Sequence, residues 1–81
     1  MPLGRIVAEN LHALRLRHKL SQRALAKKCG ISVSYVSMLE RGERTPPLET
    51  LGVLAKALAV SPWSLFREPA PERRQARRRW H

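Results

Sequence analysis

Several features are scarce in this chain of 81 residues, and each scarcity excludes a class of protein. The single cysteine, Cys29, cannot form an internal disulfide. No apolar run approaches the roughly 20 residues of a membrane-spanning helix, and the N-terminus has no signal-peptide core. His12, His18 and Cys29 lack metal-ligand spacing. We therefore expect a cytoplasmic protein with no membrane partner, metal or cofactor.

Catalytic groups and aromatic rings are also scarce. The sequence offers no paired carboxylates and no nucleophile–base spacing, which argues against an enzyme. The aromatic residues are two Trp, one Tyr and one Phe. RNA-binding proteins usually stack bases on exposed aromatic side chains, so RNA binding is the weaker nucleic-acid alternative.

Positive charge is abundant, with 16 Lys and Arg against 6 acidic residues and a net charge of +10. Residues 1–66 carry 10 basic and 4 acidic groups, a net charge of +6, and residues 67–81 carry 6 and 2, a net charge of +4. The basic excess is therefore spread over the chain. A positive field on a small domain favours polyanionic partners, with DNA first and RNA or an anionic membrane second.

The spacing of apolar residues predicts an all-α fold with five helices. We expect these helices at about 3–18, 22–29, 33–41, 47–58 and 62–66. Three serines, each placed between two apolar residues, are expected to cap the second, third and fifth helices by accepting a backbone N–H. They are Ser21, Ser32 and Ser61. The buried positions of the long helices would be Val7, Leu11, Leu14, Leu51, Leu54, Ala55 and Leu58.

Two short helices joined at Gly30 form a helix-turn-helix unit, whose second helix can enter the major groove of DNA. This unit resembles the Cro/repressor-type helix-turn-helix family, also called the XRE family. The resemblance covers about residues 7–66. It is carried by Gln22, Ala26, Gly30, Val36, Leu39 and the Glu40-Arg41-Gly42 exit. Ala59 departs from the pattern, because glycine is common at that helix end and Ala tolerates the left-handed conformation poorly.

The resemblance implies a five-helix, lambda-repressor-like DNA-binding domain at residues 1–66. It also implies a sequence-specific transcriptional regulator that binds double-stranded DNA as a homodimer on a roughly two-fold symmetric operator. Half-sites would then lie about 34 Å apart. With no second domain, no small-molecule ligand is expected.

Base contacts are expected from the outward face of the helix that begins at Val33. With Val36 and Leu39 buried, this face would carry Val33, Ser34, Ser37 and Met38. Apolar side chains there would meet thymine methyl groups, although burial is the usual explanation for Val and Met in a helix. The apolar character predicts few bidentate base contacts and more reliance on shape and phosphates.

Phosphate contacts are expected at helix ends and in the exit loop. Gln22 is assigned to a backbone phosphate because its family counterpart makes that contact, at a helix N-terminus that suits an anion. Arg23, Arg41 and Arg44 are further candidates, with simple solvation as the alternative. Tyr35 could reach a phosphate or pack against the domain.

Two structural roles complete the expected site. The resemblance implies that Arg15 of the first helix pairs with Glu40 at the end of the recognition helix. Trp63, Leu65 and Phe66 are candidate dimer-interface residues, because three large apolar side chains in a five-residue helix cannot all face inward. Core packing is the alternative for one or two of them.

Residues 67–81 lie outside the family resemblance and include five arginines within ERRQARRRWH. Such runs are usually disordered and bind polyanions. We expect a basic arm that adds non-specific DNA affinity, or a solvated tail without a role. The alternative function for the whole chain is an antitoxin that masks a toxin protein and regulates its own operon. Phage repressors, restriction–modification controllers and antitoxins are not separated by this sequence.

Overall fold

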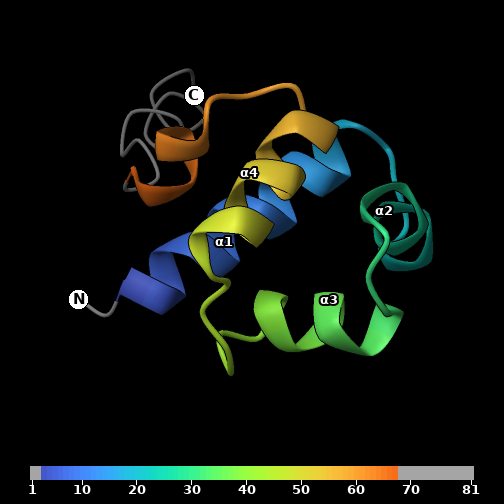
Figure 1. Cartoon of the computed structure of the whole chain (residues 1–81), viewed down its shortest axis with the longest axis horizontal. Helices are drawn as coiled ribbons and strands as arrows, with labels where there is room; N and C mark the ends of the chain where they lie inside the picture. The colour runs from blue at the N-terminus through green and yellow to red at the C-terminus, as the bar shows by residue number, and fades with distance from the viewer. Residues whose placement is uncertain (1–2, 68–81) are drawn as a thin grey trace, which may run out of the picture.

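The computed structural model describes residues 3–67, which form four α-helices and one short 3₁₀-helix (Figure 1). Within this range there is no strand. The elements are α1 (Leu3–Arg17), α2 (Gln22–Cys29), α3 (Val33–Glu40), α4 (Leu48–Ala57) and η1 (Pro62–Phe66). The all-helical prediction is confirmed, and the α-helix bounds agree with the expected ones to within one residue.

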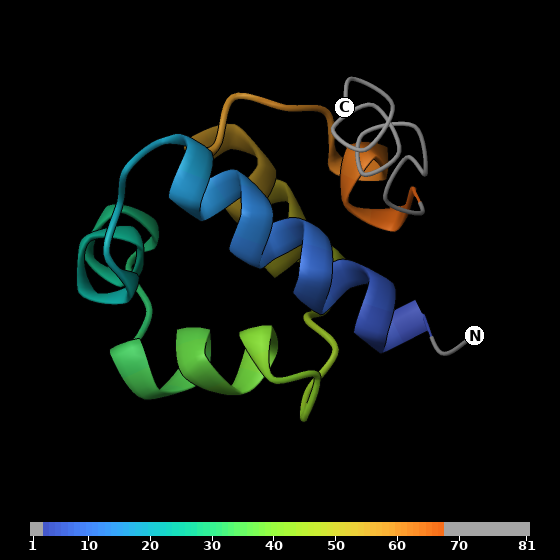
Figure 2. The same cartoon turned by 180° about the vertical axis from the view of Figure 1, so that it is seen from behind.

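The long helix α1 runs through the middle of the domain, and the other elements pack around it (Figures 1 and 2). α2 and α3 contact each other, and α3 also packs on α1. η1 packs on α1 and α4. As a result, α3 lies along one edge of the molecule, away from η1 (Figure 2).

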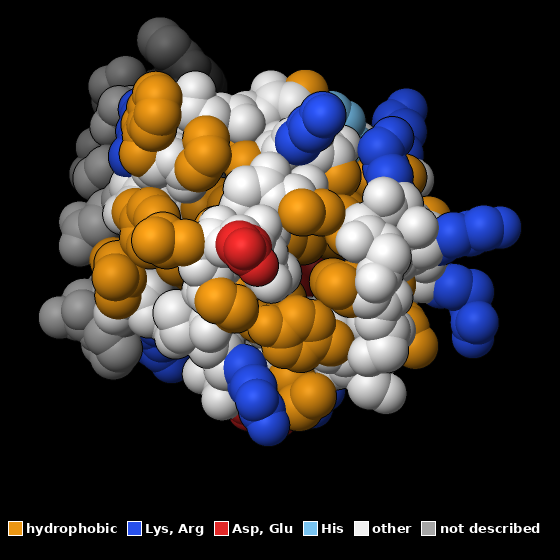
Figure 3. Space-filling view, viewed as in Figure 1, with side chains coloured by type: hydrophobic (Ala, Val, Ile, Leu, Met, Phe, Trp, Pro, Cys, Tyr) orange, Lys and Arg blue, Asp and Glu red, His pale blue; other side chains and the backbone are white. Residues whose placement is uncertain are grey.

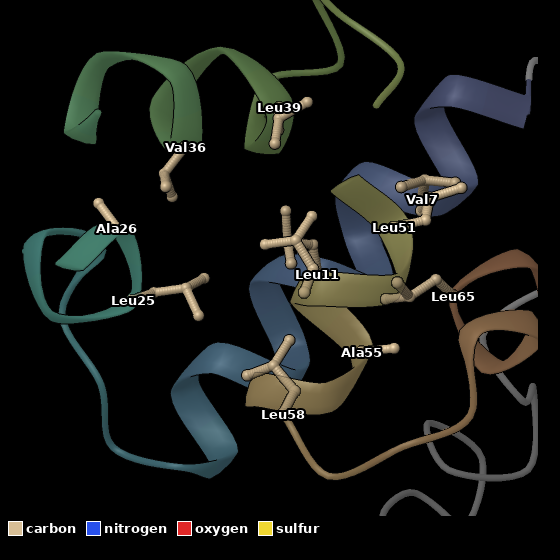
Figure 4. Close-up of a cluster of buried hydrophobic side chains, with 11 residues drawn as sticks. Val7, Leu11, Leu25, Ala26, Val36, Leu39, Leu51, Ala55, Leu58 and Leu65 are labelled. Carbon is tan, nitrogen blue, oxygen red and sulfur yellow. The ribbon is translucent and has the colours of Figure 1, made fainter. Parts of the chain in front are cut away.

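One hydrophobic core holds all five elements together, with Leu11 among the fully buried side chains (Figure 4). Cys29 lies half-buried against this core, and burial raises the pKa of its thiol despite the opposing effect of Lys28. The thiol is therefore protonated at neutral pH and packs as a small apolar group. The core consists of Val7, Leu11, Leu25, Ala26, Val36, Leu39, Leu51, Leu54, Ala55, Leu58 and Leu65.

Two of the three predicted serine caps are present. The Ser21 hydroxyl accepts from the Ala24 N–H at 2.9 Å, and the Ser32 hydroxyl accepts from the Tyr35 N–H at 3.0 Å. The prediction for Ser61 is wrong, because its side chain makes no cap bond. Instead, the Ser61 carbonyl accepts from the Ser64 N–H at 2.9 Å, which is the tighter i to i+3 pattern of a 3₁₀-helix.

The four α-helices end in the same backbone motif, in which a left-handed residue turns the chain. Glycine occupies this position after α2 and α3, with φ of 71° at Gly30 and 76° at Gly42. Lys19 and Ala59 occupy it after α1 and α4, each with φ of 59°. The left-handed conformation that Ala tolerates poorly is therefore present at Ala59, as the sequence indicated. The left-handed conformation of Lys19 has no sign in the sequence.

The C-terminal part of the domain differs from the prediction in two ways. The expected fifth α-helix is a 3₁₀-helix. Leu65, proposed for the dimer interface, is fully buried in the core and is not available to a second subunit. The side chain of Asn10 on α1 holds this end of the domain by donating to the carbonyls of Leu65 (2.8 Å) and Arg67 (2.6 Å). The predicted basic tail beyond residue 67 lies outside the described residues.

Candidate nucleic-acid interface

Helix α3 buries one side and exposes the other. Val36 and Leu39 are buried in the core, as predicted. Val33 and Ser34 are exposed, with Val33 at 36%. Ser37 and Met38 are half-buried on the flanks. The face proposed for base contacts is thus open over the first turn of the helix, the part that usually reaches base edges.

Tyr35 lies half-buried and packs against the hydrophobic core. Tyr35 was expected either to reach a phosphate or to pack against the domain, and the structure shows it packed against the domain. Its ring braces the start of α3 against the domain, next to the Ser32 cap.

The Glu40 carboxylate at the end of α3 joins three elements. Arg15 Nε lies 2.6 Å from Glu40 Oε2, and Arg15 Nη2 donates to Oε1 at 3.1 Å. The two side chains are only 9% and 5% exposed, so the predicted Arg15–Glu40 pair exists and is buried. Arg15 Nη1 also donates to the Leu20 carbonyl at 2.7 Å, just before α2.

Two further side chains converge on Glu40 Oε1. Gln22 Nε2 donates to it at 3.0 Å, and His12 Nδ1 lies 3.0 Å from it. Burial opposes ionisation of this carboxyl, but hydrogen bonds from Arg15, Gln22 and His12 outweigh it and hold the Glu40 pKa below its ordinary value. The carboxylate is therefore charged at neutral pH and fixes the start of α2 relative to the end of α3.

Gln22, the proposed phosphate contact, is the first residue of α2 and has one amide N–H engaged with Glu40. A primary amide has two N–H groups, so one remains for a phosphate beside the free backbone N–H groups of the helix start. Arg23, the next residue, is exposed.

The exit from α3 carries a second network. Arg41 donates from Nε and Nη2 to the two carboxylate oxygens of Glu43, at 2.8 and 3.1 Å, and from Nη1 to the Ser37 hydroxyl. Hydrogen bonds from Arg41 lower the pKa of the Glu43 carboxyl. The sequence-based prediction thus treated Ser37 and Arg41 as separate contacts, whereas the structure links them. Arg44 is exposed.

Charged and apolar side chains gather in different places on the surface. Figure 3 shows Lys and Arg side chains projecting from the edge formed by α2, where Arg23, Lys27 and Lys28 are exposed. On the same view, apolar side chains gather over α4 and toward η1. Exposed large apolar residues of α1, α4 and η1 are Leu3, Leu16, Leu48, Val53 and Trp63.

Sequence reasoning missed His12 and Glu43. His12 precedes Arg15 by three residues, so helical spacing could have placed both on one face. Glu43 follows the turn at Gly42, where helical periodicity no longer applies, and no simple pattern would have paired it with Arg41. Among residues 3–67 no helix is long and apolar enough to cross a bilayer, and no cluster of metal-ligating side chains occurs.

Comparison with known proteins agrees with this geometry. A family model described as helix-turn-helix matches residues 11–62. The chain belongs to the XRE-type helix-turn-helix family. Members of this family are DNA-binding transcription regulators and not enzymes. Control protein C.SmaI of Serratia marcescens is 43% identical over 61 residues, which span 75% of this chain and 73% of that protein.

Two solved structures of XRE-type proteins superpose well. The restriction–modification controller protein C.AhdI from Aeromonas hydrophila matches with a TM-score of 0.74 and 38% identity, over 78% of this chain and 96% of that one. The P22 c2 repressor, solved in complex with a synthetic operator, matches with a TM-score of 0.73 and 38% identity, again over 78% and 96%.

Proposed function

We propose that this protein binds a two-fold symmetric operator as a homodimer and regulates transcription, with α3 in the major groove. The supporting observation is the exposed face of α3, whose buried underside at Val36 and Leu39 holds Val33 and Ser34 outward. The capped starts of α2 and α3 add free backbone N–H groups that suit phosphates.

In this proposal the base edges face Val33, Ser34, Ser37 and Met38. The phosphates of the DNA backbone are contacted by Gln22, Arg23 and Arg44. Thymine methyl groups match Val33 and Met38. The similarity to the P22 c2 repressor, whose solved complex contains an operator, supports a duplex as the ligand.

The dimer contact is assigned to the apolar surface near η1. Trp63 is 68% exposed, an unfavourable position for a large aromatic ring in water. Phe66 is half-buried and packs partly against the core. Leu48 and Val53 of α4 are exposed as well, and η1 packs on α4.

The test starts from a pool of random 30-base-pair duplexes, from which the full-length protein selects its preferred sequence. Affinity for that duplex is then measured by fluorescence anisotropy between about 50 and 200 mM salt, and log affinity should fall steeply and linearly with log salt. A pool without enrichment, or an affinity insensitive to salt, would overturn the proposal.

Sedimentation equilibrium tests the dimer separately. Trp63→Ala should shift the protein toward monomer and reduce binding to a two-half-site duplex more than to a single half-site. A Leu16→Ala variant, which removes an exposed apolar side chain on α1, serves as the matched control. Equal effects of both substitutions would argue against η1 as the interface.

A further inference from the structure

Arg41 lies on the same stripe of α3 as the candidate base-reading residues. Positions 33, 37 and 41 are spaced by four, so Val33, Ser37 and Arg41 share one helix face. The bond from Arg41 Nη1 to the Ser37 hydroxyl shows that the guanidinium folds back along this face toward the helix start. Its charge therefore sits one turn nearer to Val33 than its backbone position in the exit loop indicates.

Glu43 is held in place by the backbone as well as by its side chain. The Glu43 N–H donates to the Met38 carbonyl at 3.0 Å, and the Gly42 N–H donates to the Leu39 carbonyl at 3.1 Å. Together with the left-handed Gly42, these bonds form the motif that terminates α3. These bonds anchor the Glu43 backbone to the last turn of the helix, and its exposed carboxylate pairs with the Arg41 side chain along one edge of the guanidinium.

The bonding pattern leaves Arg41 with two free donors on neighbouring atoms. A guanidinium has five N–H groups. Three of them go to Glu43 and Ser37, which leaves one on Nη1 and one on Nη2. Guanine presents two adjacent acceptors, O6 and N7, in the major groove, and Arg pairs with both.

Electrostatics favour a base over a phosphate as the ligand of this arginine. The Arg41–Glu43 pair carries no net charge, and a phosphate placed there would meet the Glu43 carboxylate as well as the guanidinium. Guanine acceptors are neutral and do not suffer this repulsion. A groove on the protein surface beside Arg41 is also lined by Arg5 and Glu9 of α1, and the opposite charges of these two residues cancel as well. Glu40 at the same groove is already engaged by Arg15.

We propose that Arg41 is a specificity-determining residue that reads a guanine in the major groove, with Glu43 as its positioning residue. This replaces the phosphate role predicted from the sequence, and it rests on the proposed operator binding. Ser37 then serves as a support for Arg41 in addition to facing the DNA.

The test uses the duplex selected by the wild-type protein and all its single-base-pair variants. Arg41→Lys keeps the charge but loses the two adjacent donors, so it should reduce discrimination at one G·C pair by about 5- to 150-fold and leave the other positions unchanged. Glu43→Gln should weaken discrimination at the same pair. Arg17→Lys, at an exposed arginine of α1 that is assigned no DNA contact, is the matched control and should leave every base preference intact.

A second measurement needs no substitution in the protein. Replacing the guanine at that pair by 7-deazaguanine removes N7 and keeps the phosphate, so wild-type affinity should fall while the affinity of Arg41→Lys stays constant. An unchanged preference in Arg41→Lys, an equal loss on all duplexes, or no 7-deazaguanine effect at any guanine would overturn the role of Arg41. Intact discrimination in Glu43→Gln would overturn the positioning role. A pool without any selected sequence would instead overturn the proposed function itself.

Discussion

The Nε atom of Arg15 lies 2.6 Å from Oε2 of Glu40, and both side chains are buried between α1 and α3. Removing one partner leaves an uncompensated charge in the interior, so Glu40→Gln should lower the free energy of unfolding by about 3 kcal/mol. Urea denaturation of Glu40→Gln, Arg15→Met and the double variant measures the coupling. The double variant should cost less than the sum of the singles, and strict additivity would contradict the pairing.

The Glu40 carboxylate should also make the free energy of unfolding decrease as the pH becomes acidic. The Glu40 pKa is lowered in the folded state from its ordinary value of 4.5, because the hydrogen bonds outweigh burial. The folded state thus binds its proton less readily, and the contribution is complete above about pH 4.5 and is lost as pH falls toward and through the folded pKa. Thermal unfolding of wild type and Glu40→Gln from pH 7 to pH 3 should show the two midpoints converging. Glu43→Gln is the control, since that exposed carboxylate contributes little.

Ala59 adopts a left-handed backbone with φ of 59° at the end of α4. Ala59→Gly relieves this strain at some entropic cost, and should raise the free energy of unfolding by about 0.5 to 1 kcal/mol. Gly30→Ala is the converse control. A methyl group there meets no atom within 4 Å, so its destabilisation reports backbone strain alone. Unchanged stability in Ala59→Gly would contradict the left-handed assignment.

The two serines at the starts of α3 and η1 should respond differently to truncation. Ser32→Ala removes the bond to the Tyr35 N–H and should cost about 1 kcal/mol. Ser61→Ala removes no cap bond and should change stability by less than about 0.5 kcal/mol. Chemical denaturation of both variants compares them directly, and equal losses would mean that Ser61 also caps its helix.

Two substitutions separate backbone contacts from base contacts in the proposed complex. Gln22→Ala should weaken binding to all duplexes by a similar factor, because a phosphate contact carries no sequence information. Met38→Ala should instead change the preference at a position that carries thymine. Anisotropy titrations on single-base-pair variants distinguish the two. If both variants keep wild-type affinity and preference, the face assigned to DNA is wrong.

The helices and their buried residues were predictable because each follows from a short-range signal. Apolar spacing gave Val36 and Leu39 as the underside of α3, and a serine before each helix gave two of the caps. The Arg15–Glu40 contact came from family resemblance and not from spacing. Gly30 was recognisable because only glycine adopts its conformation without strain.

Features that depend on tertiary packing were not predictable. Lys19 is left-handed because the chain must turn between α1 and α2, and lysine gives no sign of it. The pattern around Ser61 matched those around the two genuine caps, but a 3₁₀-helix forms there and its hydroxyl is not used. Leu65 is as apolar as Trp63, and only the position of η1 over α1 and α4 decides which one is buried.

Arg15 joins three parts of the chain, since it lies on α1 and its guanidinium reaches Glu40 at the end of α3 and the Leu20 carbonyl before α2. A domain braced in this way arrives at a duplex with its reading surface already formed. In the proposed dimer, any mismatch between two such surfaces and the groove must be absorbed by bending or twisting of the DNA. Base pairs between the half-sites, which neither subunit touches, should then influence affinity through their stiffness.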